Sequence, residues 1–453
     1  MVLLTMLFYF TSIFSRFSHD PLQGAEERIQ KYRMAKASIK ILDKKGVPVP
    51  YAKVLIAQVK HEFIFGSTVY SYVLIPEPEE KQKYFQLFSK LFNLAVVPFF
   101  WRHYEPEPGM TREEETKELI HLFQQAGIRV FGHPLIDANI PSNPPWLKKS
   151  DELENRIKAR VEREVGNFPE IQGWVVMNEP TIGWAPFPTG AWIINKGPLT
   201  ATRLSLDWAH KKNPDAILLV NNFLTNPFLD LYSVFYHLGA IPGLIFSRKV
   251  KKPISYLDLL TALSKENTPD FGIGIQSHMY SFYWPLWMTD EIITRYGKLG
   301  KPLYFTEISV PSGEFRIINW SREFQTLNWS SLPERETLQA EYVEKFYTLL
   351  FSRPEVEGII WFDFSDREAH LGAPVGLLRK DLSPKPAYDT LYHLIKEKWW
   401  TRLEAQTDQD GKLQFSGFYG VYQITVKSLE NNTQSFEINL NKIGPREFTL
   451  QMN

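Results

Sequence analysis

Two glutamates in this chain occupy positions where paired carboxylates do chemistry. Glu179 follows the apolar run Gly173–Asn178, and Glu307 closes the apolar run Leu303–Glu307. Glycoside hydrolysis requires two carboxyl groups flanking one bond, because one donates a proton while the other, ionised, attacks the anomeric carbon. Repulsion between two nearby negative charges raises one pKa and keeps that group protonated near neutral pH. The pair therefore predicts a glycosidase site.

The elements that must position this pair lie between residues 63 and 398, where short apolar runs alternate with amphipathic segments. Runs that are apolar on both faces are typical of parallel strands covered by helices. We expect an α/β fold, a (β/α)₈ TIM barrel over residues 63–400. A doubly wound open sheet is the alternative, but no glycine-rich phosphate loop follows the first strand. The eight expected strands are Phe63–Ser67, Leu94–Pro98, Ile128–His133, Gly173–Asn178, Ala216–Asn221, Gly272–His278, Leu303–Glu307 and Gly358–Phe362.

A barrel brings the C-terminal ends of its strands together on one face. Glu179 and Glu307 would follow the fourth and seventh strands, which face one another although the residues are 307 − 179 = 128 positions apart. A retaining mechanism, which we expect, needs carboxyl groups about 5–5.5 Å apart, whereas inversion needs about 6.5–9.5 Å. Thr111 and Glu114 have the spacing of a capping box, which predicts the start of the helix before the third strand.

Two β-rich segments flank the predicted barrel, at residues 25–62 and 401–453. Both contain alternating runs, such as Ser38–Leu42 and Gly420–Val426. Isolated hairpins are marginally stable in water, so each segment needs a packing partner. We expect both to lie against the barrel, either separately or together as one small sandwich.

The amino-acid composition limits which classes of binding partner and cofactor we expect. The 51 basic and 51 acidic residues cancel, which argues against nucleic acid as the partner. With no cysteine and no paired histidines at a strand end, neither a metal site nor a cofactor is predicted. Residues 1–24 begin with an apolar stretch too short for a stable membrane span. This stretch can be an export signal, an uncleaved anchor or the result of a misassigned start. The sequence therefore leaves three locations open: secreted, anchored and cytoplasmic.

At these positions the sequence resembles glycoside hydrolase family 10, the retaining endo-β-1,4-xylanases. The resemblance is carried by Trp174–Glu179, by Gly272–His278 and by Phe305–Ile308. It implies that Glu179 is the general acid/base and Glu307 the nucleophile, acting without a cofactor on a β-1,4-linked plant polysaccharide, with xylan as the expected substrate. It further implies substrate-binding or supporting roles for His133, Asn178, Gln276, His278 and Trp361.

Three departures from the family pattern affect the expected specificity. First, the segment Val96–Trp101 lacks the family's Glu-Asn pair and Lys, which hold the sugar next to the cleavage site. Second, Asp137-Ala138 replaces the family's Trp-His. Third, Ser309 replaces the family's Asp two residues beyond the nucleophile. A buried polar contact discriminates strongly between related ligands, so these changes can redirect substrate choice. A carbohydrate-binding protein without hydrolytic activity and, more remotely, a metal-dependent hydrolase are the alternative interpretations.

Overall fold

Eight parallel strands form a closed barrel at the centre of the protein, as expected. The computed structural model describes residues 20–138, 142–181, 187–223, 225, 254–316, 328–429 and 432–453. The strand order is β5-β4-β3-β11-β10-β9-β8-β7, and pairing of β5 with β7 closes the ring. The barrel strands are β3 (Ile64–Thr68), β4 (Leu94–Pro98), β5 (Arg129–His133), β7 (Gly173–Asn178), β8 (Ile217–Asn222), β9 (Gly272–His278), β10 (Leu303–Ser309) and β11 (Val356–Trp361); a short strand, β6 (Ile136–Asp137), pairs with the end of β7.

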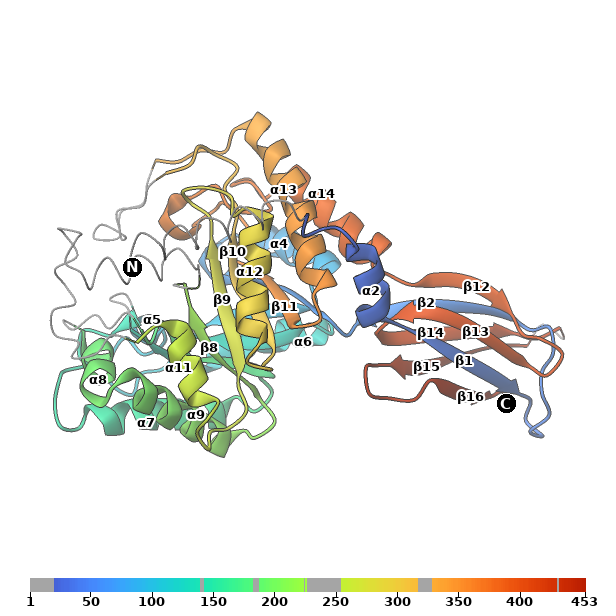
Figure 1. The fold of residues 1–453 in the computed structure, drawn as a ribbon, viewed down its shortest axis with the longest axis horizontal. Coiled ribbons are helices and arrows are strands. Elements are labelled where there is room, and N and C mark those ends of the chain that lie inside the picture. The colour runs from blue at the N-terminus through green and yellow to red at the C-terminus, as the bar shows by residue number, and fades with distance from the viewer. Residues whose placement is uncertain are drawn as a thin grey trace, which may run out of the picture.

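Helices surround this barrel (Figure 1). Their apolar faces pack on the outer face of the sheet in one continuous hydrophobic core. A separate apolar cluster fills the inside of the barrel, with Val96, Phe131, Val175, Leu219 and Ile360 among its members. The helices are α3 (Tyr70–Leu74), α4 (Pro78–Leu91), α5 (Trp101–Tyr104), α6 (Glu113–Gln125), α7 (Leu153–Asn167), α8 (Pro188–Lys196), α9 (Pro198–Lys212), α11 (Tyr256–Leu263), α12 (Leu286–Gly297), α13 (Pro333–Ser352) and α14 (Pro386–Tyr392), with a 3₁₀ helix η4 (His370–Gly372) and a π-helix η5 (His393–Lys398).

The predicted capping box is wrong. Helix α6 begins at Glu113 with Arg112 at the N-cap, and no side chain caps it. The first turn instead carries three glutamates, whose charges interact favourably with the helix dipole. Glu113 also binds Lys117 and Asn167. Charge and ion pairing therefore replace the predicted hydroxyl cap.

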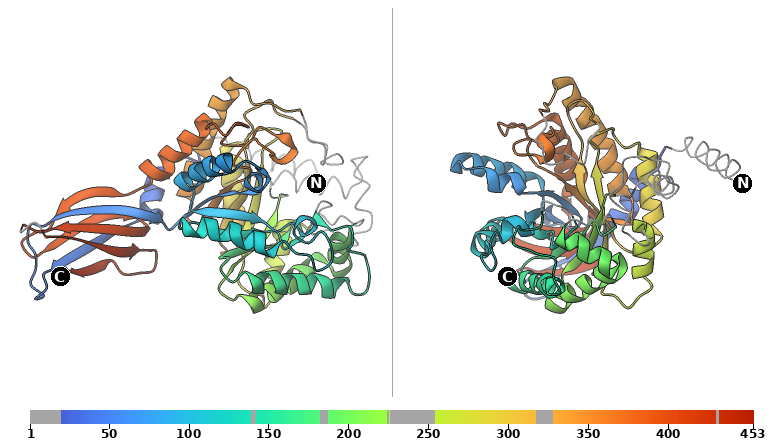
Figure 2. Two further views of the ribbon diagram at one scale, coloured as in Figure 1. Left: turned by 180° about the vertical axis from the view of Figure 1, so that it is seen from behind. Right: turned by 90° about the vertical axis from the view of Figure 1, so that its left-hand side faces the viewer.

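The two terminal β-rich segments share one sandwich, which projects from the barrel (Figures 1 and 2). One sheet has the order β13-β1-β16 and the other β12-β2-β14-β15, so each contains one N-terminal strand. Strand β2 ends only two residues before β3 begins, so the sandwich joins the barrel at the end where its strands start. The strands are β1 (Met34–Leu42), β2 (Lys53–His61), β12 (Arg402–Gln406), β13 (Lys412–Phe418), β14 (Gly420–Lys427), β15 (Thr433–Leu440) and β16 (Glu447–Gln451).

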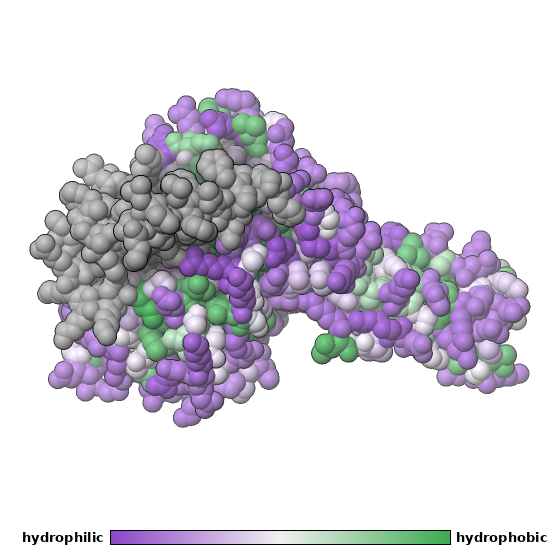
Figure 3. Space-filling view, viewed as in Figure 1, coloured by the Kyte–Doolittle hydropathy of each residue, from purple (hydrophilic) through white to green (hydrophobic). Residues whose placement is uncertain are grey.

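Helix α2 (Ala25–Arg33) connects the sandwich to the barrel through a buried cation. Arg33 is 2% exposed and donates to the carbonyl oxygens of Phe351, Arg353 and Val356. Hydrogen bonds satisfy the charge where water is excluded. The visible face of the sandwich and outer helices is mostly hydrophilic, with small apolar patches (Figure 3). Among the helices that the structure describes, none is long and apolar enough to cross a membrane.

Candidate active site

The two predicted catalytic glutamates lie at the same end of the barrel, after β7 and near the end of β10. Glu179 is 7% exposed and Glu307 is 5% exposed. The backbone N–H of Glu179 donates to the carbonyl oxygen of Asn221 at 2.8 Å, which ties it to the neighbouring strand β8. Glu179 also has a positive φ of 55°. Left-handed backbone at a non-glycine residue is costly and concentrates at functional sites.

Both catalytic strands have a register irregularity close to their glutamate. The pairing of β10 with β9 shifts between Phe305 and Glu307, and the pairing of β7 with β8 shifts between Val175 and Met177. A β-bulge breaks strict alternation and re-aims the side chains that follow it. In β10 it allows Thr306 and Glu307, which are consecutive, to line the same internal cavity. The bulges therefore help to direct the carboxylates into the barrel mouth.

Asn221, at the end of β8, links the surroundings of the two carboxylates. Its Nδ2 donates to Oε1 of Glu307 at 2.6 Å and to Oδ1 of Asn178 at 2.8 Å, while its Oδ1 accepts from Thr306 at 2.6 Å. A Cβ on Gly274 would lie 2.3 Å from Asn221 Oδ1, so the close approach needs glycine there. The sequence analysis missed Asn221. The available signal was a polar residue ending an apolar strand, although nothing in it specified the partners.

Gln276 continues this link to the second carboxylate. Its Nε2 donates to Oδ1 of Asn178 at 3.2 Å and to Oε1 of Glu179 at 3.1 Å. Two donors thus fix the carbonyl oxygen of Asn178. No described residue accepts a hydrogen bond from Asn178 Nδ2, so this amide nitrogen remains available as a donor. We call Asn178, Asn221 and Gln276 the amide floor.

His278 bridges Glu307 and Ser309. Its Nε2 is 2.9 Å from Oε2 of Glu307, and its Nδ1 is 2.8 Å from Oγ of Ser309. An ionised carboxylate only accepts hydrogen bonds, so Nε2 must carry a proton. In a neutral imidazole, Nδ1 then accepts from the serine hydroxyl. Ser309, at the position of the family's Asp, therefore takes over the orientation of His278 without adding a negative charge.

The electrostatic balance keeps Glu307 ionised. Burial raises its pKa, but the hydrogen bonds from His278 and Asn221 and the proximity of His133 outweigh this effect, so the pKa lies below its ordinary value. Burial lowers the pKa of His133, which leaves that imidazole neutral near pH 7. We therefore attribute the low pKa of Glu307 chiefly to its hydrogen bonds. An ionised Glu307 suits the role of nucleophile.

Three aromatic side chains form one side of the site, and we call Tyr70, Phe100 and Phe362 the aromatic wall. Tyr70 meets Phe100 edge to face at 5.5 Å between ring centroids and Phe362 at 5.6 Å. His133, whose Nε2 lies 3.8 Å from Oε1 of Glu307, stacks on Tyr70 at 6.3 Å. Phe100 lies within the segment where the family's polar sugar-binding groups are replaced.

Trp361, the remaining predicted site residue, lies behind the surface of the site. Its ring is fully buried, contacts Tyr347 at 6.4 Å, and its Nε1 donates to the carbonyl oxygen of Val375. Direct contact between Trp361 and a sugar therefore stays a prediction. Of the rim aromatics after β9, Tyr280 and Trp284 are buried whereas Phe282 is 48% exposed. Trp320, in the segment after β10, lies outside the described residues.

A third buried carboxyl group follows β11. Asp363 is 2% exposed, has a φ of 63°, and accepts a hydrogen bond from the backbone N–H of His370. Burial raises its pKa to about 7, and the nearby charges of Asp366 and Glu307 add to that rise. The sequence analysis missed Asp363, although it directly follows the expected strand Gly358–Phe362 in the way that Glu179 follows Gly173–Asn178. Within the described residues, no group of three or more metal-binding side chains is placed to hold an ion.

The chain is similar to known proteins over most of its length. A sequence model of "Glycosyl hydrolase family 10" matches residues 246–394, which include β9, β10 and Glu307. An "Anti-sigma-I factor RsgI6" from Acetivibrio thermocellus is 24% identical over 93% of this chain and 48% of its own length. A "Beta-1,4-xylanase" from Dictyoglomus thermophilum is 26% identical over 62% of this chain and 74% of its own length. The chain spans about half or less of the first three curated relatives.

Solved structures share the barrel. The native xylanase 10B from Thermotoga maritima matches with a TM-score of 0.56 and 19% identity, covering 74% of this chain and 96% of that one. The xylanase 10B from Thermotoga petrophila, solved with xylobiose, matches with a TM-score of 0.55 and 18% identity. At these identities the likeness establishes the fold.

Proposed function

We propose that this chain is a retaining glycoside hydrolase of glycosyl hydrolase family 10, with Glu179 as general acid/base and Glu307 as nucleophile; the family model that matches residues 246–394 supports this. The observation that carries this proposal is the amide floor, which connects the two carboxyl groups through Asn178, Asn221 and Gln276. A continuous hydrogen-bond network holds both groups in a fixed relation, which catalysis by two carboxylates needs.

In the first step, Glu307 attacks the anomeric carbon while Glu179 protonates the departing glycosidic oxygen. The hydrogen bonds from His278 and Asn221 keep Glu307 ionised and fix the orientation of its carboxylate. Asn178, fixed through its carbonyl oxygen, directs its Nδ2 donor toward the sugar. A hydrogen bond from this donor to the sugar 2-hydroxyl strengthens in the transition state and lowers the barrier.

In the second step, water hydrolyses the glycosyl-enzyme. Glu179 gave up its proton in the first step, and esterification of Glu307 removes the neighbouring negative charge, so Glu179 stays ionised and acts as base toward water. Gln276, which donates to Oε1 of Glu179, fixes the position of that carboxyl group in the structure. Attack by water from the side of Glu179 restores the original anomeric configuration.

The proposed substrate is a β-1,4-linked plant polysaccharide, with xylan as the first choice. Several relatives and structural neighbours are named as xylanases, which supports this class. The aromatic wall, in contrast, includes the ring of Phe100, which lies in the segment where the family's polar sugar-binding groups are replaced. Aromatic faces bind sugar rings through their apolar C–H surfaces. We therefore expect a glycone preference that depends more on stacking than on hydrogen bonding.

Reducing-sugar release from xylan, arabinoxylan, mixed-linkage glucan and mannan tests this proposal. We expect turnover of one polymer, a loss of about 10⁴-fold or more in Glu307→Gln, and a loss of about 10²–10⁴-fold in Glu179→Gln. Glu404→Gln, in sandwich strand β12, is the matched control and keeps full activity. Either catalytic variant retaining more than a tenth of wild-type activity would contradict the assignment.

A second candidate function is carbohydrate binding without hydrolysis. The altered sugar-binding segment favours it, as does the match over most of the chain to a protein named an anti-sigma factor. Calorimetric titration with xylo-oligosaccharides distinguishes the two functions. Binding by a wild-type protein that releases no sugar from any of the polymers would support the second function.

A further inference from the structure

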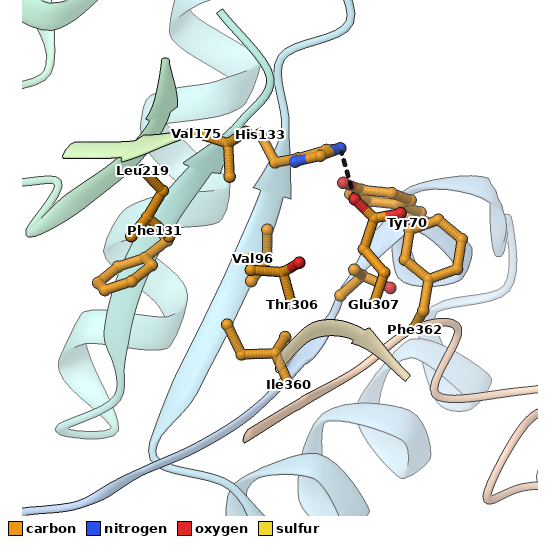
Figure 4. A pocket seen from close by; sticks show the side chains of 11 residues that line it. Tyr70, Val96, Phe131, His133, Val175, Leu219, Thr306, Glu307, Ile360 and Phe362 are labelled. Atoms are coloured by element: carbon orange, nitrogen blue, oxygen red, sulfur yellow. Dashed lines mark ion pairs between the residues drawn. The ribbon is translucent and has the colours of Figure 1, made fainter. Parts of the chain in front are cut away.

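Tyr70 is the second residue after barrel strand β3, at the start of helix α3, and shares a cavity with the proposed nucleophile. The cavity is about 10 Å³ in volume and is lined by Tyr70, Glu307, Thr306 and His133 above the apolar barrel interior. That volume is about what a single water molecule needs. Figure 4 shows the Tyr70 hydroxyl on the side of the ring that faces the Glu307 carboxyl group.

The hydroxyl of Tyr70 has no hydrogen-bond partner among the residues that the structure describes. Its oxygen is buried, although part of its ring remains exposed. Contacts with Phe100, Phe362 and His133 hold the ring on several sides. Buried hydroxyl groups without a partner are uncommon in native proteins and call for an explanation.

The surroundings keep this phenol protonated. Burial and the charges of Glu307, Asp363 and Asp137 together raise the pKa of Tyr70 well above its ordinary value. A phenol that stays protonated beside an ionised carboxylate is a neutral donor facing an acceptor. In a cavity with apolar walls, such an interaction is stronger than it would be in water.

We propose that Tyr70 is a positioning residue for Glu307, its hydroxyl donating to the carboxylate across their shared cavity as negative charge develops there. This inference rests on the proposed function and deepens it. When the bond between the sugar and Glu307 breaks, its electron pair returns to the carboxylate and full negative charge reappears. A preorganised donor that faces this charge stabilises the departing carboxylate and so lowers the barrier to deglycosylation.

Other groups around Glu307 must be held constant in any test. Among the described residues, His278 and Asn221 donate hydrogen bonds to its carboxylate. The titratable groups that interact with Glu307 or Tyr70 from the elements packed against them are His133 on β5, Asp137 on β6, His278 on β9, and Asp363 and His370 after β11. None of them is altered by removing the Tyr70 hydroxyl alone.

Tyr70→Phe removes that hydroxyl and keeps the ring. Tyr347→Phe, on α13, is the matched control, because the Tyr347 hydroxyl is also buried without a partner in the described structure but does not line the cavity. The first measurement is the pKa of Glu307 by carbon-13 NMR of glutamate-labelled protein, assigned with Glu307→Gln. It needs no substrate, so it remains informative even if the proposed hydrolase activity fails.

We expect Tyr70→Phe to raise the Glu307 pKa, because the hydroxyl dipole that faces the charged carboxylate across the cavity is lost. On a polymer that the wild type cleaves, we expect kcat to fall about tenfold, with slower decay of the glycosyl-enzyme and an acid limb of kcat/KM at higher pH. The melting temperature should not fall, and Tyr347→Phe should change none of these quantities. An unchanged Glu307 pKa in Tyr70→Phe, or an equal change in Tyr347→Phe, would overturn the proposal.

Discussion

The amide floor and the aromatic wall meet at Glu307 but are built from opposite chemistry. The floor consists of amides whose hydrogen bonds run from Glu307 through Asn221 to Asn178. The wall consists of rings in mutual edge-to-face contact, such as Tyr70 with Phe362. The floor includes Asn178 and Gln276, two polar residues that the family resemblance implies, whereas the wall includes Phe100 in the segment that departs from the family.

This difference suggests that, within one site, the amide floor serves catalysis and the aromatic wall serves substrate binding. Hydrogen bonds fix both carboxylates in direction and keep Glu307 ionised, so changes in the floor should affect kcat. Ring contacts are less directional, so changes in the wall should mainly affect how tightly a sugar is held. The barrel thus allows substrate choice to change while the catalytic geometry stays fixed.

Disrupting the amide floor should reduce activity more than disrupting the aromatic wall. Asn221→Ala removes donors to Glu307 and Asn178 together, and a hydrogen bond to a charged group contributes about 1.5–3 kcal/mol. We expect kcat to fall about 10–100-fold on the best polymer, with little change in KM. Steady-state kinetics measure the changes in kcat and KM separately. Asn93→Ala is the control, since Asn93 binds backbone groups at the opposite end of the barrel. A raised KM with an unchanged kcat would contradict a catalytic floor.

Disrupting the aromatic wall should reduce activity less than disrupting the amide floor, and it should change KM rather than kcat. Phe100→Ala removes a partly exposed ring that contacts Tyr70 and His133. We expect KM for oligosaccharides to rise up to about tenfold, because a stacking contact contributes about 0.5–1.5 kcal/mol. The value of kcat should change less than about twofold. Phe85→Ala, which removes a ring from the outer helix α4, should leave KM unchanged.

A fall in kcat with an unchanged KM in Phe100→Ala would erase the distinction between the floor and the wall. It would mean that the wall orients the catalytic groups as much as the floor does.

The sequence predicted the barrel well because each strand leaves a local signal. All eight expected strands are present, several with identical bounds, since continuous apolar runs reflect burial on both faces. Glu179 and Glu307 were found for a related reason, because a charged residue at the end of such a run points into the barrel mouth. The cap of α6 was mispredicted because ion pairs at Glu113 replace the hydroxyl cap.

The sequence does not specify the role of a residue when that role depends on a distant neighbour, even where, as at Asn221, a polar residue ends an apolar run. Asn221 matters because strand register places it between Asn178 and Glu307. Tyr70 matters because ring packing directs its hydroxyl into the cavity with Glu307. The bulges near both glutamates are likewise set by pairing between strands, which composition does not encode.

The most direct test of the central claim is to trap the covalent intermediate. Incubation with an activated 2-deoxy-2-fluoro glycoside of the preferred sugar, followed by peptide mass spectrometry, identifies the residue that forms the glycosyl bond. We predict that one sugar is attached to Glu307 and that Glu307→Gln takes up no label. A label on another residue, or a first product of inverted anomeric configuration by proton NMR, would contradict the assignment of Glu307 as nucleophile of a retaining hydrolase.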